Sequence, residues 1–134
     1  MLLSALLGSA FERNAPLLEA DYQHYARLLA GQVSPDYLAF MHAHNGGEGP
    51  VGEENYVRLL RLDEVPAYNA DCPVLKGFDG YLIFASDGGN TVYAFRGPDA
   101  VVEFDHIGLE PDEALYIAED FTGFLTSLSS DEAE

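Results

Sequence analysis

The sequence has few basic residues and a large excess of acids: six Lys and Arg stand against 23 Asp and Glu, a formal net charge of -17. This charge repels phosphate groups and anionic lipid headgroups, so we expect neither a nucleic-acid partner nor a membrane partner. The acids are also unevenly placed, because residues 97–134 contain 11 of them and no Lys or Arg. This distribution points either to a solvated surface or to a surface that attracts a basic partner.

Cysteine and long hydrophobic runs are scarce as well. Cys72 is the only cysteine, so no intrachain disulfide can form and nothing requires an oxidising compartment. The apolar stretch at residues 1–11 has no Lys or Arg before Arg13 and is shorter than the roughly 20 residues of a transmembrane helix. We therefore interpret it as an amphipathic or docking helix rather than a targeting segment, and we expect a cytoplasmic protein.

Catalytic and metal-binding motifs are missing. The chain has no G-x-S-x-G, Walker A or G-x-G-x-x-G pattern, and the sequence around Cys72 shows no signature of a catalytic thiol. The most metal-like pattern is His42-x-His44 followed by Glu48, but residues two apart on a helix point in different directions. We expect no catalytic residue, no metal and no cofactor. A small metal-assisted hydrolase that uses His42 and His44 is the enzyme alternative.

The sequence does contain enough apolar material for one folded unit. Of its 134 residues, 48% are hydrophobic, which is sufficient to offset the entropy of the chain and predicts a single domain over residues 1–134. We expect an α+β fold, with an antiparallel sheet of about four strands and helices at both chain ends. Its predicted parts are N-terminal helices over 1–30, a core over 33–128 and a polar tail over 129–134.

Periodicity and capping residues predict the helices. Apolar residues recur at helical spacing within residues 15–30: Leu18, Tyr22, Tyr25 and Leu29. Ser34-Pro35-Asp36 predicts the start of a second helix with Ser34 as its N-cap, and Asn45-Gly46-Gly47 predicts its end. Pro111-Asp112-Glu113 predicts the start of a closing helix whose apolar stripe reaches residue 128 and covers one face of the sheet.

Runs of β-forming residues predict strands at residues 56–62, 81–85, 91–95 and 101–104, with Asp87-Gly88-Gly89-Asn90 as the turn of a hairpin. Asp63 is expected to cap a short helical turn that reaches Asn69, and the Gly- and Glu-rich residues 48–55 are expected to form a loop. In the last strand Val102 and Phe104 alternate with Glu103 and Asp105. We therefore expect the two acids to point out of the sheet.

Several segments carry a family signature in their order and spacing: Ser34-Pro35-Asp36-Tyr37, Phe40, Asn45-Gly46-Gly47, Leu62-Asp63-Glu64, Asn69, Phe84 to Gly89, Tyr93 to Phe95, Phe121 and Phe124-Leu125. From Val33 to Leu128 the chain resembles the SUKH superfamily (Smi/Knr type). The resemblance implies a non-enzymatic α+β binding domain, in bacteria mainly an immunity protein that sequesters a toxin, often a nuclease, delivered by neighbouring cells. Fungal relatives regulate cell-wall assembly. The resemblance also implies a mainly structural motif: Pro35, Tyr37, Asn45, Gly46, Gly47, Ser86, Asp87, Gly88 and Gly89.

The resemblance and the acidic charge together favour a basic protein toxin as the partner. A regulatory or scaffold module without a toxin is the other non-enzymatic alternative, and the oligomeric state is left open. We place the partner-binding surface on acids of the strand-and-turn region and of the long loop: Asp87, Asp99, Glu103, Asp105, Glu53 and Glu54. The alternative for each of these acids is that it only solvates an exposed face.

Overall fold

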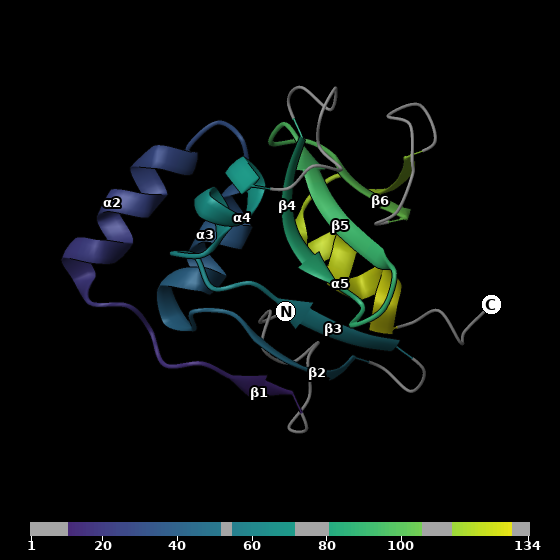
Figure 1. Ribbon diagram of the computed structural model, residues 1–134, viewed down its shortest axis with the longest axis horizontal. Helices are drawn as coiled ribbons and strands as arrows, with labels where there is room; N and C mark the ends of the chain where they lie inside the picture. Colours follow the sequence, from purple (N-terminus) through teal and green to yellow (C-terminus); the bar gives the residue numbers. More distant parts are fainter. Residues whose placement is uncertain (1–10, 52–54, 72–80, 106–113, 130–134) are drawn as a thin grey trace.

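The computed structural model describes residues 11–51, 55–71, 81–105 and 114–129, and its central feature is a seven-stranded antiparallel sheet (Figure 1). Each strand pairs with its neighbours in the sequence. The order is β1 (Glu12–Arg13), β2 (Gly47–Val51), β3 (Asn55–Leu59), β4 (Tyr81–Ser86), β5 (Thr91–Arg96), β6 (Val101–Asp105) and β7 (Leu115–Ala118). The predicted α+β class and antiparallel sheet are confirmed, whereas the expected number of about four strands is wrong.

One of the unexpected strands, β2, forms where a loop was predicted. Its residues alternate between buried and exposed positions, but two of the three buried positions are glycines. Because glycine has no side chain, this alternation leaves no hydrophobic pattern in the sequence. The pairing with β3 is nevertheless regular, from Gly47 opposite Leu59 to Val51 opposite Asn55.

The helices are α2 (Glu19–Leu29), α3 (Pro35–Ala43), α4 (Val65–Asp71) and α5 (Phe121–Ser129). The predicted helices within 15–30 and from Pro35, and the helical turn that reaches Asn69, are confirmed. The closing helix is wrong in its first part, because Leu115–Ala118 forms β7 instead. The apolar spacing from Ala114 to Phe121 suits a helix equally well, and pairing with β6 decides in favour of a strand. Of the helix expected at residues 1–11 and the tail expected at 129–134, residues 1–10 and 130–134 lie outside the described residues, and Ser129 is the last residue of α5.

The main core lies between the sheet and helices α3 and α5. Figure 1 shows α5 crossing behind β4 and β5 while α2 lies at the periphery. An aromatic cluster fills the space: Tyr37 from α3, Phe84 and Phe95 from the hairpin, and Phe121 and Phe124 from α5 are all buried. The rings of Phe84 and Phe95 stack at 4.4 Å, and Tyr37 meets both of them edge-on. Such pairs stabilise the fold beyond the burial of their area.

The other face of strands β4 to β6 carries a second set of buried apolar residues: Ile83, Val92, Ala94, Val102 and Phe104. Strands β4 and β5 are therefore buried on both faces, which explains why they read as continuous apolar runs. Helix α4 is fastened here by Asn69, whose amide donates to the Ile83 carbonyl at 2.9 Å and accepts from its N–H at 2.7 Å. None of the helices in the described part of the chain has the length and apolarity needed to span a membrane.

Candidate functional site

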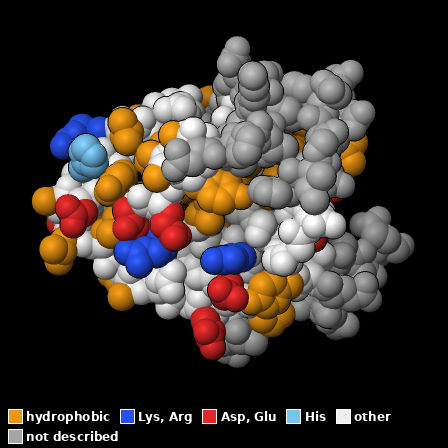
Figure 2. All heavy atoms as spheres, in the orientation of Figure 1, with side chains coloured by type: hydrophobic (Ala, Val, Ile, Leu, Met, Phe, Trp, Pro, Cys, Tyr) orange, Lys and Arg blue, Asp and Glu red, His pale blue; other side chains and the backbone are white. Residues whose placement is uncertain are grey.

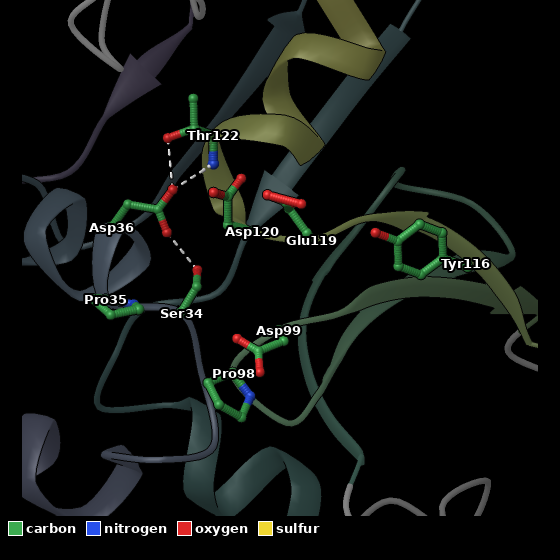
Figure 3. Close-up of a pocket in the computed structure, with 9 residues that line it drawn as sticks. All are labelled: Ser34, Pro35, Asp36, Pro98, Asp99, Tyr116, Glu119, Asp120 and Thr122. Carbon is green, nitrogen blue, oxygen red and sulfur yellow. Dashed lines mark hydrogen bonds between the residues drawn. The ribbon is translucent and has the colours of Figure 1, made fainter.

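Three segments of the chain meet around an acidic pocket of about 770 Å³ (Figure 3). They are the start of α3, the β5–β6 turn and the link from β7 to α5. The lining residues are Ser34, Pro35, Asp36, Pro98, Asp99, Tyr116, Glu119, Asp120 and Thr122. Among the described residues, the lining therefore contains four carboxylates and no Lys, Arg or His. We call this the acidic pocket below.

Two of the pocket carboxylates hold the first turn of α5. Asp36 accepts hydrogen bonds from the backbone N–H of Thr122 at 2.8 Å and from its hydroxyl at 2.6 Å. The buried Ser34 hydroxyl donates to Asp36 and accepts from the N–H of Phe121 at 3.1 Å. Ser34 is the N-cap residue of α3 as predicted, but its side chain forms no capping hydrogen bond within that helix. The start of α3 caps the start of α5 instead.

Asp120 completes this arrangement from within the β7–α5 link. It immediately precedes α5, and its carboxylate accepts the N–H of Gly123 at 2.7 Å, as an N-cap residue does. Burial alone would raise the pKa of Asp36, but the hydrogen bonds from Ser34, Thr122 and Phe121 hold it below its ordinary value. Asp36 therefore stays ionised, next to the positive end of the α5 dipole.

The other two carboxylates, Asp99 and Glu119, do not hold the start of α5. Both side chains are exposed, and neither forms a hydrogen bond or ion pair with another residue in the described part of the chain. Figure 3 shows Asp99 on the β5–β6 turn and Glu119 in the link that leads from β7 to α5. Their negative charge is thus presented to solvent at the pocket, where a cationic group can reach it.

Other parts of the surface differ from the acidic pocket in the pairing of their charges. Figure 2 shows a face on which Arg side chains lie next to acidic ones. Arg61, for example, pairs with Asp63 at 3.0 Å. Around the acidic pocket the lining offers no cation for Asp99 or Glu119.

The structure separates the acids that were predicted to bind a partner. Asp87 and Asp99 lie in the turns at opposite ends of β5, so one compact surface does not hold both. The Asp87 carboxylate is already used, because it accepts the N–H groups of Gly89 at 2.8 Å and Thr91 at 3.3 Å and closes the turn. Glu53, Glu54 and the side chain of Asp105 lie outside what the structure describes.

Glu103 does not point to an open face as the alternation was taken to mean. It pairs with Tyr93, on the face of the sheet that α5 covers, while Val102 and Phe104 belong to the second apolar face. Its side chain is half-buried. Burial and the nearby Asp87 carboxylate raise the pKa of Glu103.

Sequence reasoning missed Asp36, Tyr116, Glu119 and Asp120 as site residues. The closing helix expected from the sequence would have placed Glu119 and Asp120 on its polar side. The break between β7 and α5, which places them at the pocket, depends on pairing with β6. The usable signal is Asp120 itself, a residue type favoured at the N-cap, in the middle of the expected helix.

The model of the SMI1 / KNR4 family (SUKH-1) matches residues 16–127, which span α2 to α5. The chain belongs to the SUKH-1 family. The match confirms the expected SUKH resemblance and extends it to include α2. Comparison with curated proteins gave no significant match.

Several of the residues that the resemblance assigned to a structural motif bond to, or closely approach, the backbone of neighbouring segments in this SUKH-1 chain. Asn45 accepts the buried N–H of Leu62 at 2.7 Å and donates to Asp63 at 3.1 Å. Gly47 has a φ of 151°, and a Cβ there would lie 2.2 Å from the carbonyl oxygen of Glu12. The Ser86 hydroxyl accepts the N–H of Gly88 at 3.2 Å. The Asn45 bonds fasten the end of α3 to the segment that leads into α4, Gly47 lets β1 lie close to β2, and the Ser86 bond lies in the β4–β5 turn.

The two histidines considered for metal binding contact different parts of this SUKH-1 chain. His42 stacks on Tyr22 of α2 at 4.0 Å and lies 2.7 Å from the carboxylate of Glu19. His44 follows α3 and packs against Phe40. Glu48, the third residue of that pattern, accepts the hydroxyl of Tyr56. The three side chains therefore do not converge as metal ligands do, and the hydrolase alternative finds no support in their geometry.

Proposed function

We propose that this SUKH-1 chain is an immunity-type protein that neutralises a basic protein toxin by binding it, in the cytoplasm of the cell that makes it. Family membership supports the non-enzymatic binding role. The net charge of -17 supports a basic partner, because opposite charge accelerates encounter and disfavours partners of like charge.

The observation that carries this proposal is that two of the four pocket carboxylates form hydrogen bonds to α5 and two do not. Asp36 and Asp120 hold α5, whereas Asp99 and Glu119 are exposed and contribute no hydrogen bond to the described fold. Exposed charges of one sign, gathered without counter-charges, favour recognition of the opposite sign over stability. The acidic pocket is therefore our candidate for the toxin-binding surface, in place of the scattered acids predicted from the sequence.

The proposal is tested with the protein encoded by the neighbouring gene. Its C-terminal domain is expressed in bacteria with and without this chain, and growth and complex formation in gel filtration are measured. We expect growth arrest by the domain alone, rescue by this chain and a stable complex of the two. Rescue without a complex would support a regulatory module, and a complex without rescue would contradict neutralisation.

The same complex tests whether the negative charge of the chain accelerates its association with the toxin. We expect its association rate to fall at least about tenfold between roughly 0.01 and 0.15 M NaCl. Replacing Asp99→Lys should slow association further, while Asp21→Lys on α2 provides a charge-matched control. If the association rate changes neither with salt nor with Asp99→Lys, the pocket charge has no role in binding and an apolar interface is favoured.

A further inference from the structure

The outer edge of β7 is unusual for the edge of a sheet. Among the described strands, β7 has a neighbour on one side only, β6. Leu115 is 63% exposed and Tyr116 is 59% exposed, although both are large apolar side chains. The opposite edge, β1, is only two residues long and both are charged, Glu12 and Arg13. Short, charged edges such as β1 deter pairing with another chain, whereas β7, with the sequence LYIA, carries no charge and no proline.

The two exposed side chains of β7 lie on opposite faces of the sheet. Tyr116 is opposite Val102 and lines the acidic pocket, while Leu115 is opposite Glu103 on the other face. The register with β6 shifts between Val101 and Val102, so regular alternation holds at Leu115 and Tyr116. A strand added beside these two residues would place one side chain next to Tyr116, on the pocket side, and the following one next to Leu115 on the other face. A basic side chain on the pocket side can contact the Tyr116 ring and reach Asp99 or Glu119. An apolar side chain on the other face can cover Leu115.

We infer that the β7 edge binds an extended basic segment of the partner as an added strand, with an arginine or lysine of that segment in the acidic pocket. The inference rests on the proposed function and names the part of the partner that the acidic pocket recognises. The backbone of β7 supplies hydrogen bonds for affinity, and the exposed carboxylates select the charge of the added strand. The occupant is argued from charge complementarity, since the pocket lining has acids and no cation.

The probe is a short synthetic peptide of alternating arginine and valine, which offers one basic face and one apolar face. Two control peptides accompany it. One has glutamate in place of arginine, and the other carries backbone N-methyl groups at alternate residues, which remove strand hydrogen bonds but keep every side chain. Binding is followed by calorimetry, and hydrogen exchange of the β7 amides is followed by NMR.

We expect the arginine–valine peptide to bind and to slow exchange of the β7 amides, and both control peptides to bind at least about tenfold more weakly. Asp99→Asn and Leu115→Ser should each weaken binding measurably, by up to about tenfold. Their matched controls are Asp21→Asn and Leu18→Ser on the α2 side, where Leu18 is 78% exposed. These two should leave binding unchanged.

Equal binding of the N-methylated peptide would overturn strand addition, as would protection of amides elsewhere with β7 unprotected. The result also separates this inference from the proposed function. If the chain neutralises its toxin and the complex is insensitive to Leu115→Ser and Asp99→Asn, the inference fails and the function stands. If the peptide binds at β7 but no toxin is neutralised, the edge site stands and the proposed function fails.

Discussion

Asn45 shows how one residue joins three segments of this chain. Its carbonyl oxygen accepts the N–H of Leu62, its amide donates to Asp63, and its own backbone carbonyl accepts the Asn14 side chain at 3.0 Å. The residue is buried, so none of these groups can exchange its partner for water without opening the loop. The Asn-Gly-Gly sequence was interpreted as a helix stop. Its asparagine also ties the end of α3 to the segment that leads into α4.

At the residue scale, we predict that Asn45→Ala lowers the free energy of unfolding by about 1–3 kcal/mol, because the buried N–H of Leu62 loses its acceptor. The measurement is chemical denaturation followed by circular dichroism. Asn90→Ala is the matched control, since Asn90 is exposed in the β4–β5 turn, and it should change stability by less than about 0.5 kcal/mol. Equal effects of the two substitutions would contradict the role of Asn45.

At the scale of elements, α3 and α5 are joined through their N-terminal ends. Asp36, in the first turn of α3, accepts the N–H and hydroxyl of Thr122 in α5, and the aromatic rings of Phe40 and Phe121 meet at 5.4 Å. These groups satisfy N–H groups of α5 that have no partner within the helix. The contact spans 86 positions of the sequence, so it also holds the closing helix against the first half of the chain.

We predict that Asp36→Asn destabilises the protein by about 1 kcal/mol at neutral pH, as loss of a helix cap does. The pKa of Asp36 is below its ordinary value of 3.8, so its contribution is present above that pH and is lost as the pH falls through the lower folded value. The difference between wild type and Asp36→Asn should therefore shrink in strong acid. Melting temperatures across pH measure it.

Asp99→Asn is the control for this prediction, because it removes a carboxylate from the same pocket without removing a described hydrogen bond. We expect it to leave the melting temperature unchanged or slightly higher at neutral pH. If Asp99→Asn lowers the melting temperature as much as Asp36→Asn does, the distinction between structural and exposed carboxylates is wrong.

At the scale of the whole molecule, the charge of -17 opposes the compact state through self-repulsion. Among the described residues, Arg61 pairs with Asp63 and the His42 ring contacts the carboxylate of Glu19. Both are exposed, and exposed pairs contribute little. The fold therefore depends on its apolar core and its hydrogen bonds, with net electrostatic repulsion acting against them.

We predict that the melting temperature rises between about 0.01 and 0.15 M NaCl, because the screening length falls from about 30 to about 8 Å. Scanning calorimetry at constant pH measures the rise. A triple variant, Asp21→Asn with Asp99→Asn and Glu119→Gln, removes three exposed negative charges and should show a smaller rise. The prediction is wrong if the triple variant responds to salt as strongly as the wild type.

The sequence by itself determined the features that depend on neighbouring residues. Helices α2 and α3 follow from apolar spacing and from Ser34-Pro35-Asp36, and the β4–β5 hairpin follows from its Gly-rich turn. The fold class followed from the succession of such segments, and the acidity of the chain followed from its composition. The order of the motif segments also identified the family, which the match over residues 16–127 confirms.

Only the tertiary structure decided β2, β7 and the membership of the acidic pocket. Strand β2 has glycines at its inward positions, and β7 has a spacing that a helix also satisfies, so both are settled by pairing with β3 and β6. The pocket joins Asp36 with Asp99 and Glu119, which are far apart in the sequence. The physical reason is that strand pairing and helix capping act here between segments that are distant in the sequence. A local sequence pattern does not specify which distant segment it will contact.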